Sequence, residues 1–213
     1  MLSQVYMSTN KDIEFEKLRD LMMANRSVRR FQEDRKVGID TLERLVELTR
    51  YCPSGRNIQP LRYVLVNEDE LRCKVFPLLM WAGYFEDWAG PEEGERPAAY
   101  LIQCLDTQYG RDCLCDDGLQ LEAITLGMHT LGLSGCIIKA FNGKKLSEVL
   151  ALGDRYVPRY VLAVGYPAEE VVIEDMNPDK EDNHKYYRTP DGIHHVPKRP
   201  FEELIIRMEM DKI

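Results

Sequence analysis

Stretches with a helical repeat of apolar residues and short, continuously apolar stretches follow one another in an irregular order along the chain. Helical spacing is found in residues 13–24, 40–49, 68–80, 116–131 and 144–150, and strand-like stretches are residues 62–67, 98–106 and 160–165. Residues 134–141 fit either a strand or a buried turn. Because helices and strands do not alternate strictly, the pattern predicts an α+β fold.

The ends of the predicted elements carry weaker signals. Asp40 is expected to cap the second helix, with Glu43 three residues later completing a capping box, and Pro53 to stop it. Residues 201–208 repeat the helical spacing, although so short a segment could also pair as a strand.

The length and composition favour a single domain over residues 1–213. The chain has 213 residues, of which 44% are hydrophobic, and no interior linker divides it. Residues 170–197 hold prolines and glycines among charges, so we expect an extended excursion there within the domain.

The charge and the distribution of apolar residues argue against nucleic acid and a membrane as partners. The net charge is −8, from 28 basic and 36 acidic residues, so a nucleic-acid backbone is a poor partner. No apolar stretch reaches the ~18 residues that span a bilayer, and residues 1–20 are too charged for a secretory signal. We therefore expect a cytoplasmic protein without membrane contacts. A basic cluster between Arg26 and Lys36 suits a small anionic ligand.

Familiar catalytic and metal-binding motifs are missing from the sequence. The six cysteines include no Cys-x-x-Cys pair, so no metal site is expected. There is no dinucleotide fingerprint, P-loop, His-Glu-x-x-His or Gly-x-Ser-x-Gly motif. His129 lies in a predicted helix and is expected to be structural. For His194 and His195, in a polar stretch, solvent exposure is the default and ligand contact the alternative.

Two short segments carry the chemistry. The first is Asn25–Phe31 (NRSVRRF), whose guanidinium groups suit bidentate binding of phosphate, although a solvated basic turn after a helix would have the same composition. The second is Cys52–Pro60 (CPSGRNIQP), a stiff loop rich in amide and hydroxyl groups that fits either a polar heterocycle or an ordinary helix-ending turn.

Together these segments resemble the FMN-dependent nitroreductase family. That family has an Arg-Ser-x-Arg-x-Phe stretch after its first helix and a Pro-Ser-x-x-Asn-x-Gln-Pro loop about 25 residues later. Residues 132–138 (GLSGCII) are similar to the family's Gly-Leu-Gly-x-x-Trp-Ile segment, and the similarity continues through residues 161–167 and Lys198-Arg199-Pro200. It covers nearly the whole chain.

The resemblance implies a central, mainly antiparallel sheet flanked by helices, in an intertwined homodimer with two FMN sites at the interface. It assigns Arg26, Ser27 and Arg29 to the phosphate and ribityl chain, joined by Lys198 or Arg199. The partner subunit would supply Pro53, Ser54, Gly55, Asn57 and Gln59, and Ile137 and Ile138 would lie along the flavin ring. No side chain is assigned as catalytic, because flavin N5 would carry the chemistry.

Three positions depart from the family pattern, and one loop is a candidate substrate lid. Asn25 stands where many members have arginine, Leu61 where an aromatic residue is common, and Lys139 where glycine is frequent. Lys139 would steer an anionic substrate or lie near the flavin N1–C2=O edge. The lid candidates are Trp81, Tyr84, Phe85 and Trp88, whose alternative role is local packing.

The function implied by this resemblance is an NAD(P)H-dependent flavin oxidoreductase. NADH or NADPH would reduce the flavin, which would pass the hydride from N5 to a nitroaromatic, quinone or enone by a ping-pong mechanism. Two alternatives stay open at this point. One is a flavin-binding carrier, sensor or regulatory module without turnover, and the other is a globular scaffold that binds no flavin.

Overall fold

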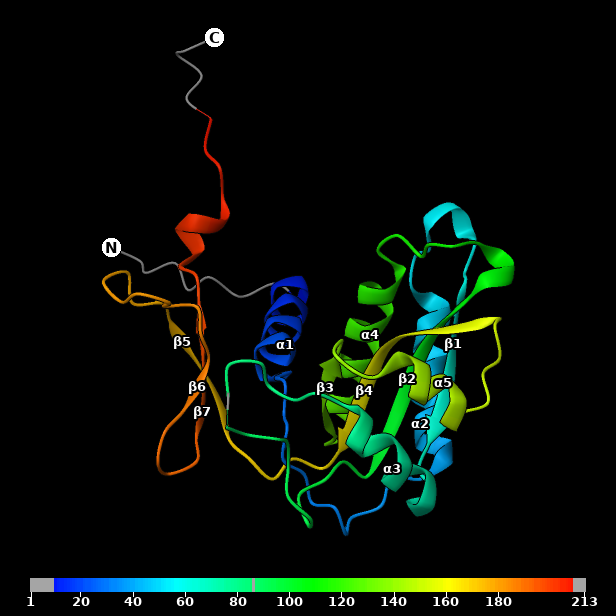
Figure 1. Ribbon diagram of the computed structural model, residues 1–213. Coiled ribbons are helices and arrows are strands. Elements are labelled where there is room, and N and C mark those ends of the chain that lie inside the picture. The colour runs from blue at the N-terminus through cyan, green and yellow to red at the C-terminus, as the bar shows by residue number, and fades with distance from the viewer. Residues whose placement is uncertain (1–9, 86, 209–213) are drawn as a thin grey trace, which may run out of the picture.

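A four-stranded antiparallel sheet forms the centre of the protein in this computed structural model, which describes residues 10–85 and 87–208 (Figure 1). The strands lie in the order β1-β2-β4-β3, and each neighbouring pair is antiparallel. Their bounds are Leu61–Val66 for β1, Ala99–Asp106 for β2, Ser134–Ile138 for β3 and Tyr156–Gly165 for β4. The predicted α+β class and mainly antiparallel central sheet are confirmed.

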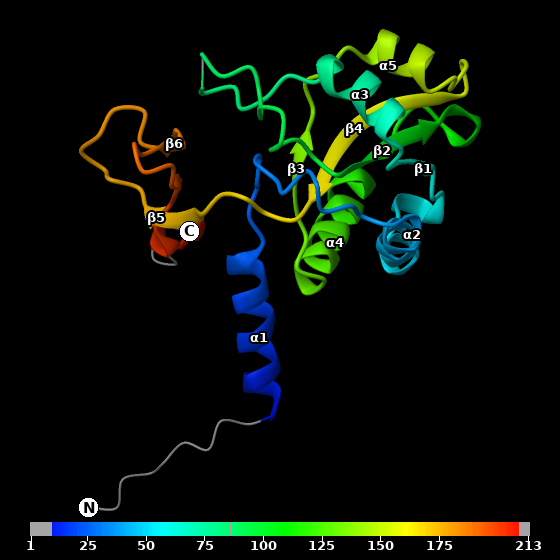
Figure 2. The same cartoon turned by 90° about the horizontal axis from the view of Figure 1, so that it is seen from below.

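Helices cover both faces of this sheet (Figure 2). α2 (Ile39–Glu47) and α4 (Asp116–Thr130) pack on one face, and α3 (Asp69–Val75) and α5 (Gly143–Val149) lie on the other. The 3-10 turns are η1 (Leu48–Tyr51), η2 (Gly55–Asn57), η3 (Phe76–Leu78), η4 (Thr107–Tyr109) and η5 (Phe201–Leu204). Among the described residues, no helix combines the length and apolarity that crossing a membrane requires.

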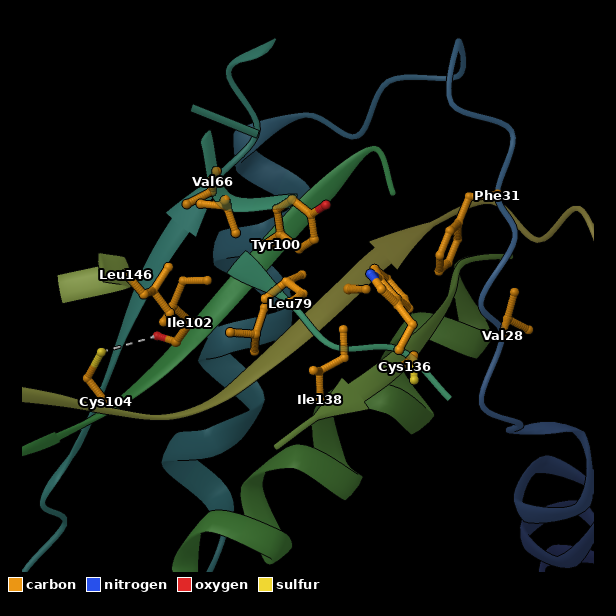
Figure 3. Close-up of a cluster of buried hydrophobic side chains, with 14 of the residues drawn as sticks. Val28, Phe31, Val66, Leu79, Tyr100, Ile102, Cys104, Cys136, Ile138 and Leu146 are labelled. Atoms are coloured by element: carbon orange, nitrogen blue, oxygen red, sulfur yellow. Dashed lines mark hydrogen bonds between the residues drawn. The ribbon is translucent and has the colours of Figure 1, made fainter. Parts of the chain in front are cut away.

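β2 joins the two hydrophobic cores because every one of its residues is buried. Tyr100 and Ile102 point into the core on the α3 and α5 side, where Figure 3 shows them beside Leu79 and Leu146. Leu101 belongs to the core on the other face, with residues of α2 and α4. Successive residues of a strand point to opposite faces, so a strand buried on both sides is mostly apolar. The two polar exceptions, Gln103 and Asp106, form side-chain hydrogen bonds.

Two predicted element boundaries were wrong. α2 begins at Ile39 with Gly38 before it, and no side chain caps it, so the capping box from Asp40 is absent. Asp40 instead lies in the first turn, where its charge complements the helix dipole. β4 begins at Tyr156, four residues before the predicted strand. It accommodates Pro158 because the pairing register with β2 shifts at that point.

A second, three-stranded sheet stands apart from the central sheet in Figure 1, to the left of α1 (Asn10–Ala24) in that view. Its order is β5-β7-β6, with β5 (Val171–Asp175) parallel to β7 (His194–Lys198), and β6 (Tyr187–Arg188) antiparallel to it. Most of residues 170–197, expected as an extended excursion, build this sheet and its connections.

Both chain ends expose apolar side chains. α1 projects away from the body in Figure 2. Within residues 199–208 the chain forms the 3-10 turn η5, whereas a longer helix or a strand was expected over residues 201–208. The exposed apolar residues are Ile13, Phe15, Leu18, Met22 and Met23 of α1, and Phe201, Leu204, Ile205, Ile206 and Met208 near the other end. The apolar face predicted for the first helix is therefore largely uncovered in the single chain.

Candidate functional site

A basic cavity of about 370 Å³ lies where the segment after α1 meets β3, α4 and the second sheet. It is lined by Asn25, Arg26, Ser27, Arg29, Glu122, Thr125, Gly135, Ile137, Tyr186, His194, Val196 and Lys198. The cavity thus brings together Arg26, Ser27, Arg29, Ile137 and Lys198 of the residues that the sequence assigned to cofactor binding. Arg26, Ser27 and Arg29 follow α1 near one end of the chain, Lys198 lies in β7 near the other, and Ile137 lies between them in β3.

The segment after α1 is held by its apolar residues, which sets the direction of its polar ones. Val28 and Phe31 are buried at one edge of the core in Figure 3. The Val28 backbone N–H donates to the Gly135 carbonyl at 2.9 Å, and Ser27 forms a bridge with Gly135 of β3. Ser27 and Arg29, on either side of Val28, line the cavity instead. Over residues 27–29 the direction of the side chains therefore follows from extended backbone, in which successive residues point to opposite sides.

The three cations of the cavity outnumber its one carboxylate, Glu122. Among the described residues, Arg26, Arg29 and Lys198 form no ion pair within 4.0 Å. The buried Nε of Arg26 and the Nε and Nη1 of Arg29 also lack hydrogen-bond partners in the described part of the chain. Burial lowers the pKa of Arg26, while the carboxylate of Glu122 opposes that shift. Arg26 does use its Nη2, which donates to the Met22 carbonyl at 2.6 Å. Guanidinium groups with remaining unpaired donors around a cavity fit a phosphate dianion.

The buried carboxylate of Glu169 already accepts hydrogen bonds from two other groups. Glu169, just after β4, accepts hydrogen bonds from the Arg188 side chain at 2.6 Å and from the Arg29 backbone N–H. It therefore neutralises Arg188 and leaves the Arg29 guanidinium to the cavity.

Gly135 is required where β3 forms the cavity wall. A Cβ at this position would lie 2.3 Å from the Ala163 carbonyl oxygen of β4, which belongs to the central sheet and cannot turn aside. We expect Gly135→Ala to lower the free energy of unfolding by about 1–3 kcal/mol, the usual cost of overpacking, in urea titrations. Gly143→Ala is the control, because its Cβ would lie 3.7 Å from the Phe141 ring. Equal stability of the two variants would contradict this account of the wall.

His194 is buried, in contrast to the exposed position expected from the sequence. It is the first residue of β7 and has no exposed surface, because its ring packs between Phe85 at 5.6 Å and Tyr186 at 5.3 Å between centroids. His195 faces the other way, with Nδ1 3.1 Å from Glu174 and its ring stacked on Tyr187. The prediction failed because the strand was not recognised, and a strand places adjacent residues on opposite faces.

The pKa of His194 is lowered to about 4, chiefly by burial. The positive charges of Arg29 and Arg188 and the neighbouring His195 contribute to this lowering, and the Glu169 carboxylate opposes it. The unfolded chain binds a proton here below about pH 6.5, but the folded chain does so only below about pH 4.

The free energy of unfolding should therefore decrease as the pH is lowered from about 6.5 to about 4. We expect the unaltered chain to lose roughly 3 kcal/mol more unfolding free energy than His194→Phe between pH 7 and pH 4. Urea titrations at pH 7, 6, 5 and 4 measure the difference. Parallel curves for the two proteins would mean that the folded state does not depress this pKa.

The candidate lid residues lie next to the cavity wall. The Phe85 ring is 5.2 Å from Tyr186, and the Tyr84 ring is 4.8 Å from it. Trp88 packs against Phe85 at 6.0 Å and against the buried Trp81 at 6.5 Å. The loop and the second sheet thus share one aromatic cluster that includes the cavity residues Tyr186 and His194.

The amide-bearing loop lies outside the cavity. Pro53, Ser54, Gly55, Asn57 and Gln59 are not among the residues that line it. The loop is held by the buried carboxylate of Asp116, which accepts from Ser54 Oγ at 2.6 Å and from the Gly55 N–H at 2.9 Å. Arg56, Asn57 and Gln59 have φ values of 54°, 56° and 51°. Three non-glycine residues in this region indicate backbone strain, a feature that clusters at functional sites.

Other residues singled out by the sequence lie away from the cavity. Ile138 points into the core on the opposite side of β3 from Ile137, and Arg199 pairs with Glu203 at 3.0 Å. Leu61 is buried at the start of β1. The Lys139 ammonium is 4.2 Å from the centre of the Tyr160 ring.

Asn25, in contrast, does line the cavity, and its Nδ2 donates to Thr125 Oγ1 at 2.9 Å.

Sequence reasoning missed several residues of the site. Asp116, Tyr186, Glu122, Thr125 and Gly135 reach the loop or the cavity through contacts between distant segments. Only Gly135 had a local signal, as the second glycine of the residues 132–138 motif.

Comparisons with known proteins agree on one class. The Nitroreductase family model matches residues 22–105. An oxygen-insensitive NADPH nitroreductase of Helicobacter acinonychis is 24% identical over 173 residues, which cover 66% of this chain and 82% of that protein. The resemblance to the nitroreductase family is therefore confirmed.

Solved structures show the same fold. A nitroreductase family protein from Streptococcus pneumoniae has a TM-score of 0.63 at 19% identity, covering 90% of this chain and 100% of that one. An FMN-dependent nitroreductase from Clostridium difficile has a TM-score of 0.58 at 18% identity, covering 70% and 87%. The chain has the nitroreductase fold.

Proposed function

We propose that the protein is an FMN-dependent oxidoreductase that uses NADH or NADPH to reduce an electron-poor acceptor such as a nitroaromatic, quinone or enone. The observation that carries the proposal is the cavity with three cations that form no ion pair with any described residue, against the single carboxylate Glu122 in its wall. The names of the similar proteins support the same activity.

The residues of the cavity divide by chemistry. Arg26, Arg29 and Lys198 would bind the phosphate, and the Ser27 hydroxyl would bind a phosphate or ribityl oxygen. Ile137, with 40% of its surface exposed, offers an apolar contact for the ring. When bound, FMN would supply hydride transfer through N5, so that donor and acceptor would use the site in turn. The aromatic loop from Trp81 to Trp88 would exclude water above it.

We propose further that the active form is a homodimer. The exposed apolar residues of α1 and of the segment after β7 would be covered by a second copy. The strained loop, which lies outside the cavity of its own chain, would then complete the cavity of the partner.

The decisive experiment is anaerobic reduction. The purified protein is loaded with FMN, mixed with NADH or NADPH, and followed by the loss of flavin absorbance. Bleaching that reverses on adding menadione or a nitroaromatic supports the enzyme. Bound flavin that stays oxidised would favour the carrier or sensor alternative, and a protein that takes up no FMN would favour the scaffold.

Mixed dimers test whether the loop acts across the interface. We expect Arg29→Ala and Asn57→Ala to weaken FMN binding when each is present in both subunits. A dimer with one subunit of each kind would combine the intact Arg29 of one chain with the intact Asn57 of the other. Differently tagged subunits, co-expressed and purified as heterodimers, should bind one FMN tightly per dimer. No tight site in the heterodimer would place both residues in the same chain's site.

A further inference from the structure

His194 is a buried side chain whose ring packs against its neighbours but whose polar atoms remain unsatisfied by the described residues. Neither Nδ1 nor Nε2 has a hydrogen-bond partner among the residues that the structure describes. A buried polar group normally has one, and leaving it without a partner destabilises the protein. An aromatic residue at this position would satisfy the contacts with Phe85 and Tyr186 without that cost. The imidazole therefore needs an explanation outside the fold.

The position of His194 connects it with the basic cavity. His194 and Tyr186 both belong to the cavity wall, and their rings contact each other. The Tyr186 ring also contacts the Arg29 guanidinium, whose carbon is 4.9 Å from the ring centroid. Arg29 has unpartnered buried nitrogens of its own. The unused donors of a histidine and an arginine thus gather around one tyrosine.

We propose that His194 is a ligand-binding residue whose neutral imidazole N–H donates a hydrogen bond to the phosphate of the bound cofactor. The inference rests on the proposed function, since it concerns the same cavity. A neutral ring suits this role because it adds a donor without adding a fourth cation. The surroundings keep it neutral, since burial beside Arg29 and Arg188 disfavours the protonated form.

His194 becomes accessible only if a neighbouring ring moves, because the residue has no exposed surface. Tyr186 is the neighbour that we expect to move, since it is half-buried, lines the cavity and has its ring centroid 5.3 Å from that of His194. The Arg29 guanidinium is 4.9 Å from the centre of the same ring, so turning the tyrosine aside would also release that contact. We therefore expect the phosphate to displace Tyr186.

Opposite effects on stability and binding distinguish this role from a structural one. We expect His194→Phe to raise the Tm of the free chain by about 2–4 °C, because it removes unpartnered polar atoms. The same change should weaken FMN binding about threefold to tenfold, measured by quenching of flavin fluorescence. His195→Phe is the matched control on the other face of β7, where we expect FMN affinity to stay within twofold. Should Phe overpack the site, His194→Leu serves the same comparison.

Nuclear magnetic resonance of the histidine rings tests the contact in the unaltered chain, and variants are needed only to assign the signals. The ¹⁵N signals of His194, assigned by their loss in His194→Phe or His194→Leu, should shift on adding FMN and not on adding riboflavin. The His195 signals should stay in place.

The outcomes separate the two claims. FMN binding with unchanged His194 signals and equal affinity in the variants would overturn the role of His194 and leave the proposed function standing. Equal shifts with riboflavin would overturn the assignment to the phosphate. Absence of FMN binding to the unaltered chain would overturn the proposed function and this inference with it.

Discussion

Replacing Arg29 by alanine is expected to weaken FMN binding by ~1.5–3 kcal/mol, or about 10-fold to 150-fold, which is the range for a hydrogen bond to a charged group. The reason is that the Arg29 guanidinium has buried nitrogens with no partner and no counter-ion in the described part of the chain. The free chain should not lose stability in proportion, because the change removes a half-buried charge that forms no ion pair with a described residue. Flavin fluorescence titration and urea unfolding measure the two effects.

Two further variants sharpen this test. Arg29→Lys keeps the charge but loses the planar fork, so we expect a smaller loss of affinity than with alanine. Arg35→Ala is the control, because Arg35 is exposed and packs over the Tyr166 ring away from the cavity. Full FMN affinity in Arg29→Ala, or the same loss in Arg35→Ala, would contradict the assignment of Arg29.

Replacing Asp116 by alanine is expected to destabilise the protein by about 3 kcal/mol. The buried carboxylate is the acceptor for both Ser54 Oγ and the Gly55 N–H, and its removal leaves two donors without partners. The strained loop from Arg56 to Gln59 would lose its anchor. Urea unfolding measures the stability, and the rate of proteolysis within residues 53–60 measures the loop.

The Asp116 variants also have a functional consequence. Asp116→Asn keeps one acceptor and should lose about half as much stability, while Asp154→Ala, a charge removed from an exposed position, should be neutral. In mixed dimers, an Asp116→Asn subunit paired with an Arg29→Ala subunit should form one tight site, because it supplies the intact Arg29 and its partner supplies the intact loop. Paired with an Asn57→Ala subunit it should form none, because both loops are then impaired. Restoration with both partners would show that Asp116 does not act through the loop.

The elements with strong periodicity were predicted well, and the reason is burial. β2 and α4 lie within one or two residues of the expected segments because their apolar residues face cores that the sequence pattern reflects directly. The second sheet was missed because its strands are only two to five residues long and lie among charged residues and turns. Without β7, the inward direction of His194 could not be inferred.

The candidate site was only partly accessible to sequence reasoning. Composition alone indicated an anion near Arg26 and Arg29, and family resemblance was needed to bring Lys198 to them from the far end of the chain. The Ser54–Asp116 hydrogen bond joins residues 62 positions apart, and such a contact leaves no local pattern. Contacts of this kind depend on the folded chain as a whole.

The central claim is that the cavity cations bind the phosphate of FMN, and a paired titration of the unaltered chain with FMN and riboflavin tests it most directly. The two flavins share the same ring and differ in the phosphate. We predict that FMN binds with one site per chain and at least tenfold more tightly than riboflavin, with the difference shrinking as salt concentration rises. Equal affinity for both flavins, or no binding of either, would contradict the account.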